Sequence, residues 1–151
     1  MAKADRRVFI DTWGWLSLED RSEPAHQAVV ALRRQHAAQS ITWLTTDYIL
    51  DEAITRLYSR RPFDEAAQFF TGIFRASQLG QLGIERITQE RFDAAYALRL
   101  KLRDKPRVSF TDLTSFTVMR ELGIHQVVTG DAHFAQVNLG FAIVPSLPAP
   151  G

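Results

Sequence analysis

Three aspartates lie at the end or the start of an apolar segment of the sequence. Asp11 follows the apolar run "VFI", Asp112 comes at the start of a largely apolar helical segment, and Asp131 follows "VVTG". Taken singly, each has an ordinary structural explanation. Asp11 is a strand-end residue that caps the next helix, the serine three positions before Asp112 completes a capping box, and Gly-Asp is common turn chemistry. For any single position the structural explanation is the stronger one.

Considered jointly, the same aspartates predict a metal site. Carboxylates that converge repel one another unless a cation offsets their charge. Mg²⁺ and Mn²⁺ take oxygen ligands from a few carboxylates and retain several waters. A bound cation of this kind lowers the pKa of a coordinated water and stabilises charge on a phosphoryl oxygen. The chemistry predicted for such a cluster is phosphodiester hydrolysis.

A predicted helix from about Thr46 to Ser59 supplies further acids, among them Asp51 and Glu52. Its apolar face is built from isoleucine, leucine and alanine at helical spacing. Asp51 and Glu52 lie on opposite flanks of that face, at similar angles from its axis. Periodicity therefore leaves open which of the two turns toward the site.

The elements that must position these acids alternate between short apolar strands and longer helices. Strands are predicted at 7–10, 40–46, 82–87, 125–130 and 141–145. Helices are predicted at 22–38 with Ser22 as the cap, at 46–59 and at 63–77. Two more are predicted, one after the cap residue Thr88 and one that begins near Asp112 and is closed by Gly123. This alternation is typical of a parallel sheet covered by helices. Ligands of such sheets bind at the carboxyl ends of the strands, where Asp11 and Asp131 both fall.

Length and composition restrict the alternatives. The 151 residues predict one domain, 1–151, with a core at about 7–145 and a proline-rich tail at 146–151. The absence of cysteine excludes disulfides, thiolate metal sites and a cysteine nucleophile. No apolar run is long enough to span a bilayer, and the N-terminus lacks an export signal, so we expect a cytoplasmic protein without membrane contact.

The basic residues are mostly arginines, since only three of the 18 are lysines. Net charge is +1, so the whole molecule does not present itself as a polyanion binder. The densest basic stretch is "RFDAAYALRLKLRDKPR", at 91–107. A solvated helix face is its simplest interpretation, and an edge that follows a phosphate backbone is the alternative.

Four segments resemble the PIN-domain family, and within it the VapC-like toxins of bacterial toxin–antitoxin modules. They are "VFIDTWGWL", "TTDYILDEAITRL", "SFTDLTSFTVMRELGI" and "VVTGDAHF", in the family's order and spacing. The resemblance covers roughly Val8 to Val144. It implies an α/β/α sandwich with a central, mostly parallel sheet, and a Mg²⁺- or Mn²⁺-dependent endoribonuclease acting on RNA. It also implies a homodimer and inhibition by a cognate antitoxin.

The resemblance also selects the site residues. The family's four metal-binding acids correspond to Asp11, Glu52, Asp112 and Asp131, and its small hydroxyl residues to Thr12 and Thr129. These hydroxyls are expected to steady the acids or a coordinated water. The RNA backbone is expected to contact basic side chains of the 91–107 stretch, for which the candidates are Arg99, Arg103 and Arg107.

One position departs from the pattern. Many relatives carry a basic residue directly after the last acid, where this chain has Ala132. His133 is a candidate for the missing local role, but a lone histidine beside an aromatic residue is more often a packing or hydrogen-bonding residue. It is therefore left out of the catalytic set. Trp13 and Trp15 lie close enough to Asp11 to stack on a base, although packing in the core or at a protein interface is the preferred interpretation.

Two alternatives stay open and a third is weak. A metal- and RNA-binding PIN-like module without hydrolysis is consistent with the weakened phosphate contact at Ala132, and a PIN nuclease of general RNA metabolism would need no antitoxin. A doubly wound phosphatase or receiver domain also places an aspartate at a strand end. The segment "DTWGW" lacks the second acid that such phosphatases show two residues later.

Overall fold

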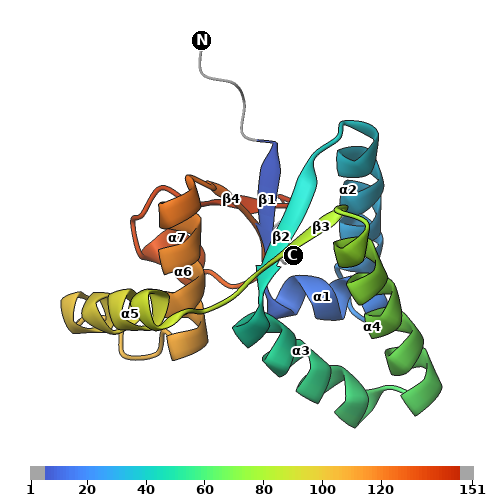
Figure 1. The fold of residues 1–151 in the computed structure, drawn as a ribbon, viewed down its shortest axis with the longest axis horizontal. Coiled ribbons are helices and arrows are strands. Elements are labelled where there is room, and N and C mark those ends of the chain that lie inside the picture. The colour runs from blue at the N-terminus through green and yellow to red at the C-terminus, as the bar shows by residue number, and fades with distance from the viewer. Residues whose placement is uncertain (1–5, 147–151) are drawn as a thin grey trace.

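A five-stranded parallel sheet forms the centre of the protein (Figure 1). The computed structural model describes residues 6–146. The strand order is β3-β2-β1-β4-β5, and every neighbouring pair is parallel. The strands are β1 (Arg7–Ile10), β2 (Thr42–Thr46), β3 (Leu82–Glu85), β4 (Gln126–Val128) and β5 (Ala142–Val144). The predicted α/β fold with helices on a parallel sheet is therefore confirmed.

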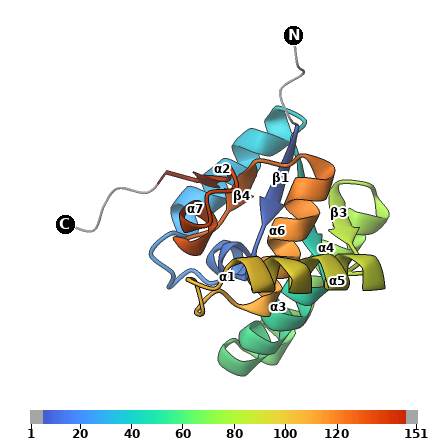
Figure 2. The ribbon, with the colours of Figure 1, turned by 90° about the vertical axis from the view of Figure 1, so that its left-hand side faces the viewer.

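Helices cover both faces of the sheet. They are α1 (Thr12–Glu19), α2 (His26–Ala38), α3 (Asp47–Arg60), α4 (Phe63–Gln78), α5 (Gln89–Lys101), α6 (Phe110–Leu122) and the short α7 (His133–Gln136). Helices α5, α6 and α7 lie on one side, and α1, α2 and α4 on the other (Figures 1 and 2). Helix α3 lies beyond the carboxyl ends of the strands and contacts α1, α4 and α6. The carboxyl edge is thus enclosed by helices from both layers.

The core explains why β1 and β4 read as continuous apolar runs. Val8, Phe9 and Ile10 have no exposed surface, and neither do Val127 and Val128. A parallel strand between two helical layers is buried on both faces, so it has no polar alternation. This burial fixes the positions from which the residues directly after each strand emerge.

Helix ends follow the predicted capping chemistry at most positions. The hydroxyls of the predicted caps Thr88 and Ser109 each accept a hydrogen bond from the backbone N–H three residues on, and the hydroxyl of Thr46 does the same at the start of α3. Gly123 closes α6 in the left-handed conformation, with φ 69°. These caps set where α3, α5 and α6 begin or end.

The helix start predicted at Ser22 is wrong, because α2 begins at His26. The Ser22 backbone N–H and hydroxyl both donate to the carboxylate of Asp20, at 3.0 and 2.7 Å. This local turn uses the serine side chain that was expected to cap the helix. The short helix α7 was also not predicted.

Two further expectations concern the ends of the chain and the membrane. The proline-rich tail predicted at 146–151 lies, beyond Ser146, outside the described residues. Within the described part of the chain, no helix combines the length and apolar character that crossing a bilayer requires.

Candidate active site

A cleft of about 340 Å³ opens at the carboxyl edge of the sheet. The four predicted acids, Asp11, Glu52, Asp112 and Asp131, all line it. They come from four separate segments: the end of β1, the second turn of α3, the first turn of α6 and the loop after β4. Segments up to 120 positions apart in the chain therefore meet here because parallel strands share one carboxyl edge.

Asp11 has a structural role and also faces the cleft. Its Oδ1 accepts a hydrogen bond from the Gly14 backbone N–H at 3.0 Å and so caps α1. Its Oδ2 accepts a short hydrogen bond from the Thr129 hydroxyl. The residue is 5% exposed, so the position of its carboxylate is fixed from both sides.

Thr129 joins the ends of β1 and β4. Its hydroxyl donates to Asp11 and accepts from the backbone N–H of Asp131 at 2.9 Å. The Asp131 carboxylate accepts in turn from the backbone N–H of His133 at 2.9 Å. One buried hydroxyl thereby sets the spacing between two of the candidate acids.

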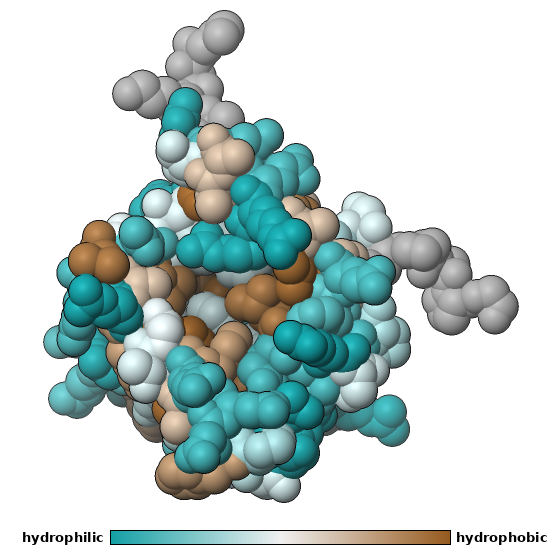
Figure 3. Space-filling view, turned by 90° about the vertical axis from the view of Figure 1, so that its right-hand side faces the viewer, coloured by the Kyte–Doolittle hydropathy of each residue, from teal (hydrophilic) through white to brown (hydrophobic). Residues whose placement is uncertain are grey.

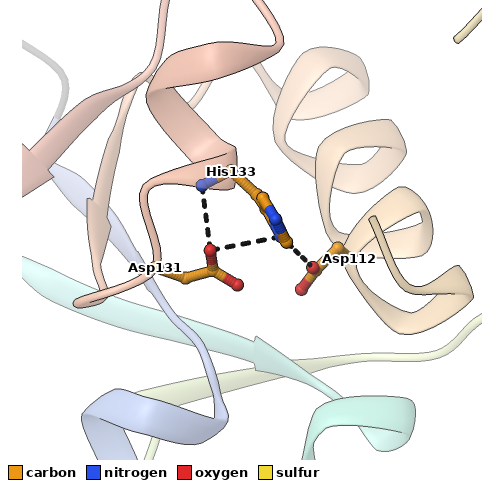
Figure 4. A group of neighbouring side chains, drawn as sticks. All are labelled: Asp112, Asp131 and His133. Atoms are coloured by element: carbon orange, nitrogen blue, oxygen red, sulfur yellow. Dashed lines mark hydrogen bonds and ion pairs between the residues drawn. The ribbon is translucent and has the colours of Figure 1, made fainter. Parts of the chain in front are cut away.

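His133 stands between two acids (Figure 4). Its Nδ1 lies 3.2 Å from an oxygen of Asp131 and 3.7 Å from an oxygen of Asp112. The three side chains offer potential ligand atoms that all lie within 4.8 Å of one another. Sequence reasoning set this histidine aside. The signal in the sequence was the spacing, because His133 follows Asp131 by two residues. Aspartate side chains in turns commonly accept a hydrogen bond from the backbone two residues on.

The choice between Asp51 and Glu52 is clear in the geometry. Glu52 lines the cleft, and Asp51 is exposed on α3 away from it. Glu52 also lies 3.5 Å from the guanidinium of Arg56, one helical turn on. Arg56 lines the cleft and was missed by sequence reasoning, although its spacing from Glu52 was visible.

Burial and nearby carboxylates oppose ionisation of Asp11 and Asp112. Desolvation raises the pKa of Asp11 to about 7, and nearby Asp112 and Asp131 add to the rise, while the bonds from Thr129 and Gly14 oppose it. The pKa of Asp112 is also raised, first by burial and then by Asp131. Such a pair is costly in its charged form unless a cation lies nearby.

The donor set fits a hard divalent cation. It consists of carboxylate oxygens around a cleft, with His133 beside two of them. One further oxygen, Thr12 Oγ1, is buried without a hydrogen-bond partner among the described residues. Buried hydroxyls normally have a partner. Mg²⁺ and Mn²⁺ prefer oxygen ligands and bring coordinated water that such a hydroxyl can contact.

The three candidate RNA-binding arginines have different surroundings. Arg107 lines the cleft. The Arg99 guanidinium donates to the backbone carbonyls of Leu102, Lys105 and Val108. Arg103 is exposed, and no ion pair is seen for it within residues 6–146.

The two tryptophans after Asp11 have different surroundings. Trp13 lines the cleft and lies against Gly130, where an added Cβ would be 2.4 Å from the indole ring. Trp15 is 3% exposed and donates its indole N–H to the Thr45 hydroxyl at 3.2 Å. The packing interpretation therefore holds for Trp15, and Gly130 is needed for the close approach of Trp13.

Comparison with known proteins points to one group. The 23S rRNA-specific endonuclease VapC20 of Mycobacterium tuberculosis is 29% identical over 128 residues, which cover 85% of this chain and 92% of the relative. No family model matches the chain.

Solved structures agree with the sequence match. The crystal structure of M. tuberculosis VapC20, described as a Sarcin-Ricin loop cleaving toxin, aligns with a TM-score of 0.70 at 26% identity, over 87% of this chain and 95% of that one. VapBC2 from Rickettsia felis, bound to a promoter DNA fragment, shares the fold with a TM-score of 0.69 at 14% identity, over 91% of this chain and 96% of that one. The match to VapC20 along most of both chains and the shared fold show that the chain is VapC-like in sequence and fold.

Proposed function

We propose that the protein is a Mg²⁺- or Mn²⁺-dependent endoribonuclease and the toxin of a toxin–antitoxin pair. One observation carries the proposal: four carboxylates from four segments line one cleft, with Arg56 and Arg107 beside them. A site of this composition combines oxygen ligands for a cation with positive charge for a phosphate backbone. The similarity to an endonuclease along most of the chain supports the same reaction.

Each cleft residue has a distinct task in this proposal. Asp11, Glu52, Asp112 and Asp131 would hold the cation, which when bound supplies Lewis acidity for the attacking water and for the scissile phosphate. Thr129 favours the ionised form of Asp11 and orients its carboxylate through a short hydrogen bond. Thr12 offers a free hydroxyl for orienting water.

Charge around the cleft would bind and align the RNA. Arg56 and Arg107 both line it and can neutralise phosphates on either side of the cleaved bond. Either arginine could supply the positive charge that many relatives carry at the position of Ala132. His133 Nδ1 lies between Asp112 and Asp131 and would help to orient their carboxylates.

The relative named for 23S rRNA makes that RNA the first substrate to test. Purified protein should cleave it with Mg²⁺ or Mn²⁺ and should be inactive in EDTA. Glu52→Gln should reduce the single-turnover rate by about 100-fold or more, in line with the loss of groups that stabilise transition-state charge. Asp51→Asn is the matched control, since it removes the neighbouring acid on the same helix that faces away from the cleft.

The outcomes separate the possibilities. If Glu52→Gln and Asp51→Asn reduce the cleavage rate equally, then the charge of α3, and not the cleft, governs activity. Cleavage by Asp112→Asn at the wild-type rate would assign the activity to a contaminant and refute the site. Tight, salt-dependent RNA binding without products would favour the non-hydrolytic alternative.

An antitoxin is the proposed regulatory partner, and an apolar groove between α2 and α4 is a suitable surface. The face carrying these helices is hollowed, with apolar side chains inside and hydrophilic ones around it (Figure 3). The groove, of about 340 Å³, is lined by Trp15, Trp43, Phe69 and Ile73 among others. Amphipathic helices bind such grooves through their apolar face.

Arg33 adds a charge preference to this groove. Its guanidinium lies 5.2 Å from the centroid of Trp43, and burial lowers its pKa. No carboxylate pairs with it among residues 6–146. The proposed partner segment is therefore apolar with an acidic residue that reaches Arg33.

A homodimer is also part of the proposal. Phe92, Tyr96 and Leu100 form an exposed apolar stripe on α5, at intervals of one helical turn. Each is at least 43% exposed, and contiguous apolar surface of this kind commonly marks a protein interface. This stripe is the candidate contact between two copies.

A further inference from the structure

A second cavity, of about 320 Å³, lies beside the carboxylate cleft. Lys105, Arg107, His133 and Gln136 line it. Arg107 lines both cavities. His133 separates them, because its Nδ1 faces Asp112 and Asp131 while the ring also forms part of the wall of the second cavity.

The segment that carries the two cations is firmly held. The Arg99 guanidinium donates to the backbone carbonyls of Lys105 and Val108, both at 2.8 Å, and to that of Leu102. Bonds from a charged donor to several carbonyls are strong, and they define the path of residues 102–108. Arg99 is thus a positioning residue for Lys105 and Arg107.

The cations themselves are available to a ligand. No ion pair is seen for Arg107 among the described residues. Lys105 pairs at 3.3 Å with Asp104, which also lines the cavity and whose side chain is 76% exposed. An exposed pair of neighbouring residues contributes little and can be exchanged for a stronger anion.

We propose that the second cavity is the subsite for the nucleotide next to the cleaved bond. The RNA strand would leave the carboxylate cleft over Arg107, which contacts the phosphate at the junction, and place the following sugar-phosphate against Lys105. Gln136 offers an amide for the sugar or base. This inference rests on the proposed endoribonuclease function and adds where the flanking RNA binds.

Steady-state cleavage of a short RNA tests the subsite. The substrate is the smallest 23S rRNA fragment that the wild type cleaves, with two shorter forms that lack nucleotides on one side of the cleaved bond or the other. Arg107→Ala should raise KM about tenfold with kcat nearly unchanged, the effect of one charge-assisted bond to phosphate. Lys105→Ala should raise KM by a smaller factor, because Asp104 already shares that charge.

Arg120→Ala is the control, since it removes an exposed arginine of α6 that lines neither cavity. In the wild type, one of the two truncations should raise KM, and in Arg107→Ala that truncation should have no further effect. The dependence of KM on salt should weaken in Arg107→Ala by about 0.7 in log–log slope, the value for one phosphate on a single strand.

The possible failures are distinct. If Arg107→Ala and Arg120→Ala have equal KM values, or if Arg107→Ala lowers kcat at unchanged KM, the subsite is refuted while the nuclease stands. If the effects of Arg107→Ala and of both truncations simply add, the subsite is also refuted. If the wild type cleaves none of the RNAs, the proposed function fails and the subsite with it.

Discussion

Replacing Asp11 by asparagine should stabilise the cation-free protein, and only at alkaline pH. Burial raises the pKa of Asp11 from 3.8 to about 7 in the folded chain. Between these two values the folded state binds more protons at this group than the unfolded state does. The stability associated with protonated Asp11 is therefore present at low pH and is lost as pH rises through about 7.

The magnitude follows from the same values. A tenfold change in acidity corresponds to about 1.4 kcal/mol, so ionised Asp11 costs the folded protein about 4 kcal/mol in total. Between pH 5 and pH 8.5 the wild type should lose about 2.5 kcal/mol of its free energy of unfolding through this group. Asparagine keeps an oxygen for the Gly14 N–H and carries no charge, so the variant should escape this loss. It weakens the bond to Thr129, which offsets part of the gain at every pH by about 1–2 kcal/mol.

Urea unfolding of wild type and Asp11→Asn in EDTA, at pH 5 and pH 8.5, measures the difference directly. The difference in free energy of unfolding between the two proteins should change by about 2.5 kcal/mol in favour of the variant from pH 5 to pH 8.5. Asp51→Asn, an exposed acid, should follow the wild type. Adding Mg²⁺ at pH 8.5 should stabilise the wild type by mass action and leave the variant unchanged. Parallel pH profiles for wild type and Asp11→Asn would refute the buried, destabilised carboxylate.

Three further changes test other parts of the structure. Thr129→Val removes a bond that lowers the pKa of Asp11, so the acid limb of the cleavage pH profile should move to higher pH; an unmoved limb would contradict this role. Gly130→Ala places a Cβ 2.4 Å from the Trp13 ring and should cost about 1–3 kcal/mol in thermal unfolding experiments, so an unchanged Tm would show that the indole can shift freely. Tyr96→Glu should convert the proposed dimer to a monomer in light-scattering measurements, and a variant that stays dimeric would exclude the α5 stripe.

The sequence predicts the elements of this fold better than their exact relations. Apolar runs gave the parallel strands, and hydroxyl residues marked the starts of α3, α5 and α6, because both signals act over a few neighbouring residues. Ser22 shows where local rules compete, since the carboxylate of Asp20 used the groups expected to cap α2. Local chemistry alone cannot decide between two such partners.

Tertiary placement decided the rest of the site. Asp51 and Glu52 were equivalent by periodicity, and only the position of α3 across the sheet edge turns Glu52 into the cleft. The same holds for Arg99 and Arg107, which a sequence reading treats alike although one braces a loop and the other lines a cleft. Side chains of equal type are distinguished by what other segments bring near them.

The caps and turns that explain the aspartates structurally also hold in place the carboxylates that are proposed to bind the cation. Asp11 gives one oxygen to the start of α1 and one to Thr129, Asp131 accepts from the backbone of His133, and the Asp112 N–H is bound by the Ser109 hydroxyl. Each bond holds a carboxylate in place although the other carboxylates repel it. The folded protein therefore bears the energetic cost of this repulsion before any cation binds. Carboxylates held in this way need little reorganisation when the cation binds. Relief of their mutual repulsion should therefore add to the affinity for the cation. It follows that loosening a cap, for example with Ser109→Ala, should weaken Mg²⁺ binding measured by calorimetry, because Ser109 forms hydrogen bonds with both the backbone and the side chain of Asp112. Equal affinity in this variant would mean that the acids are placed by packing alone.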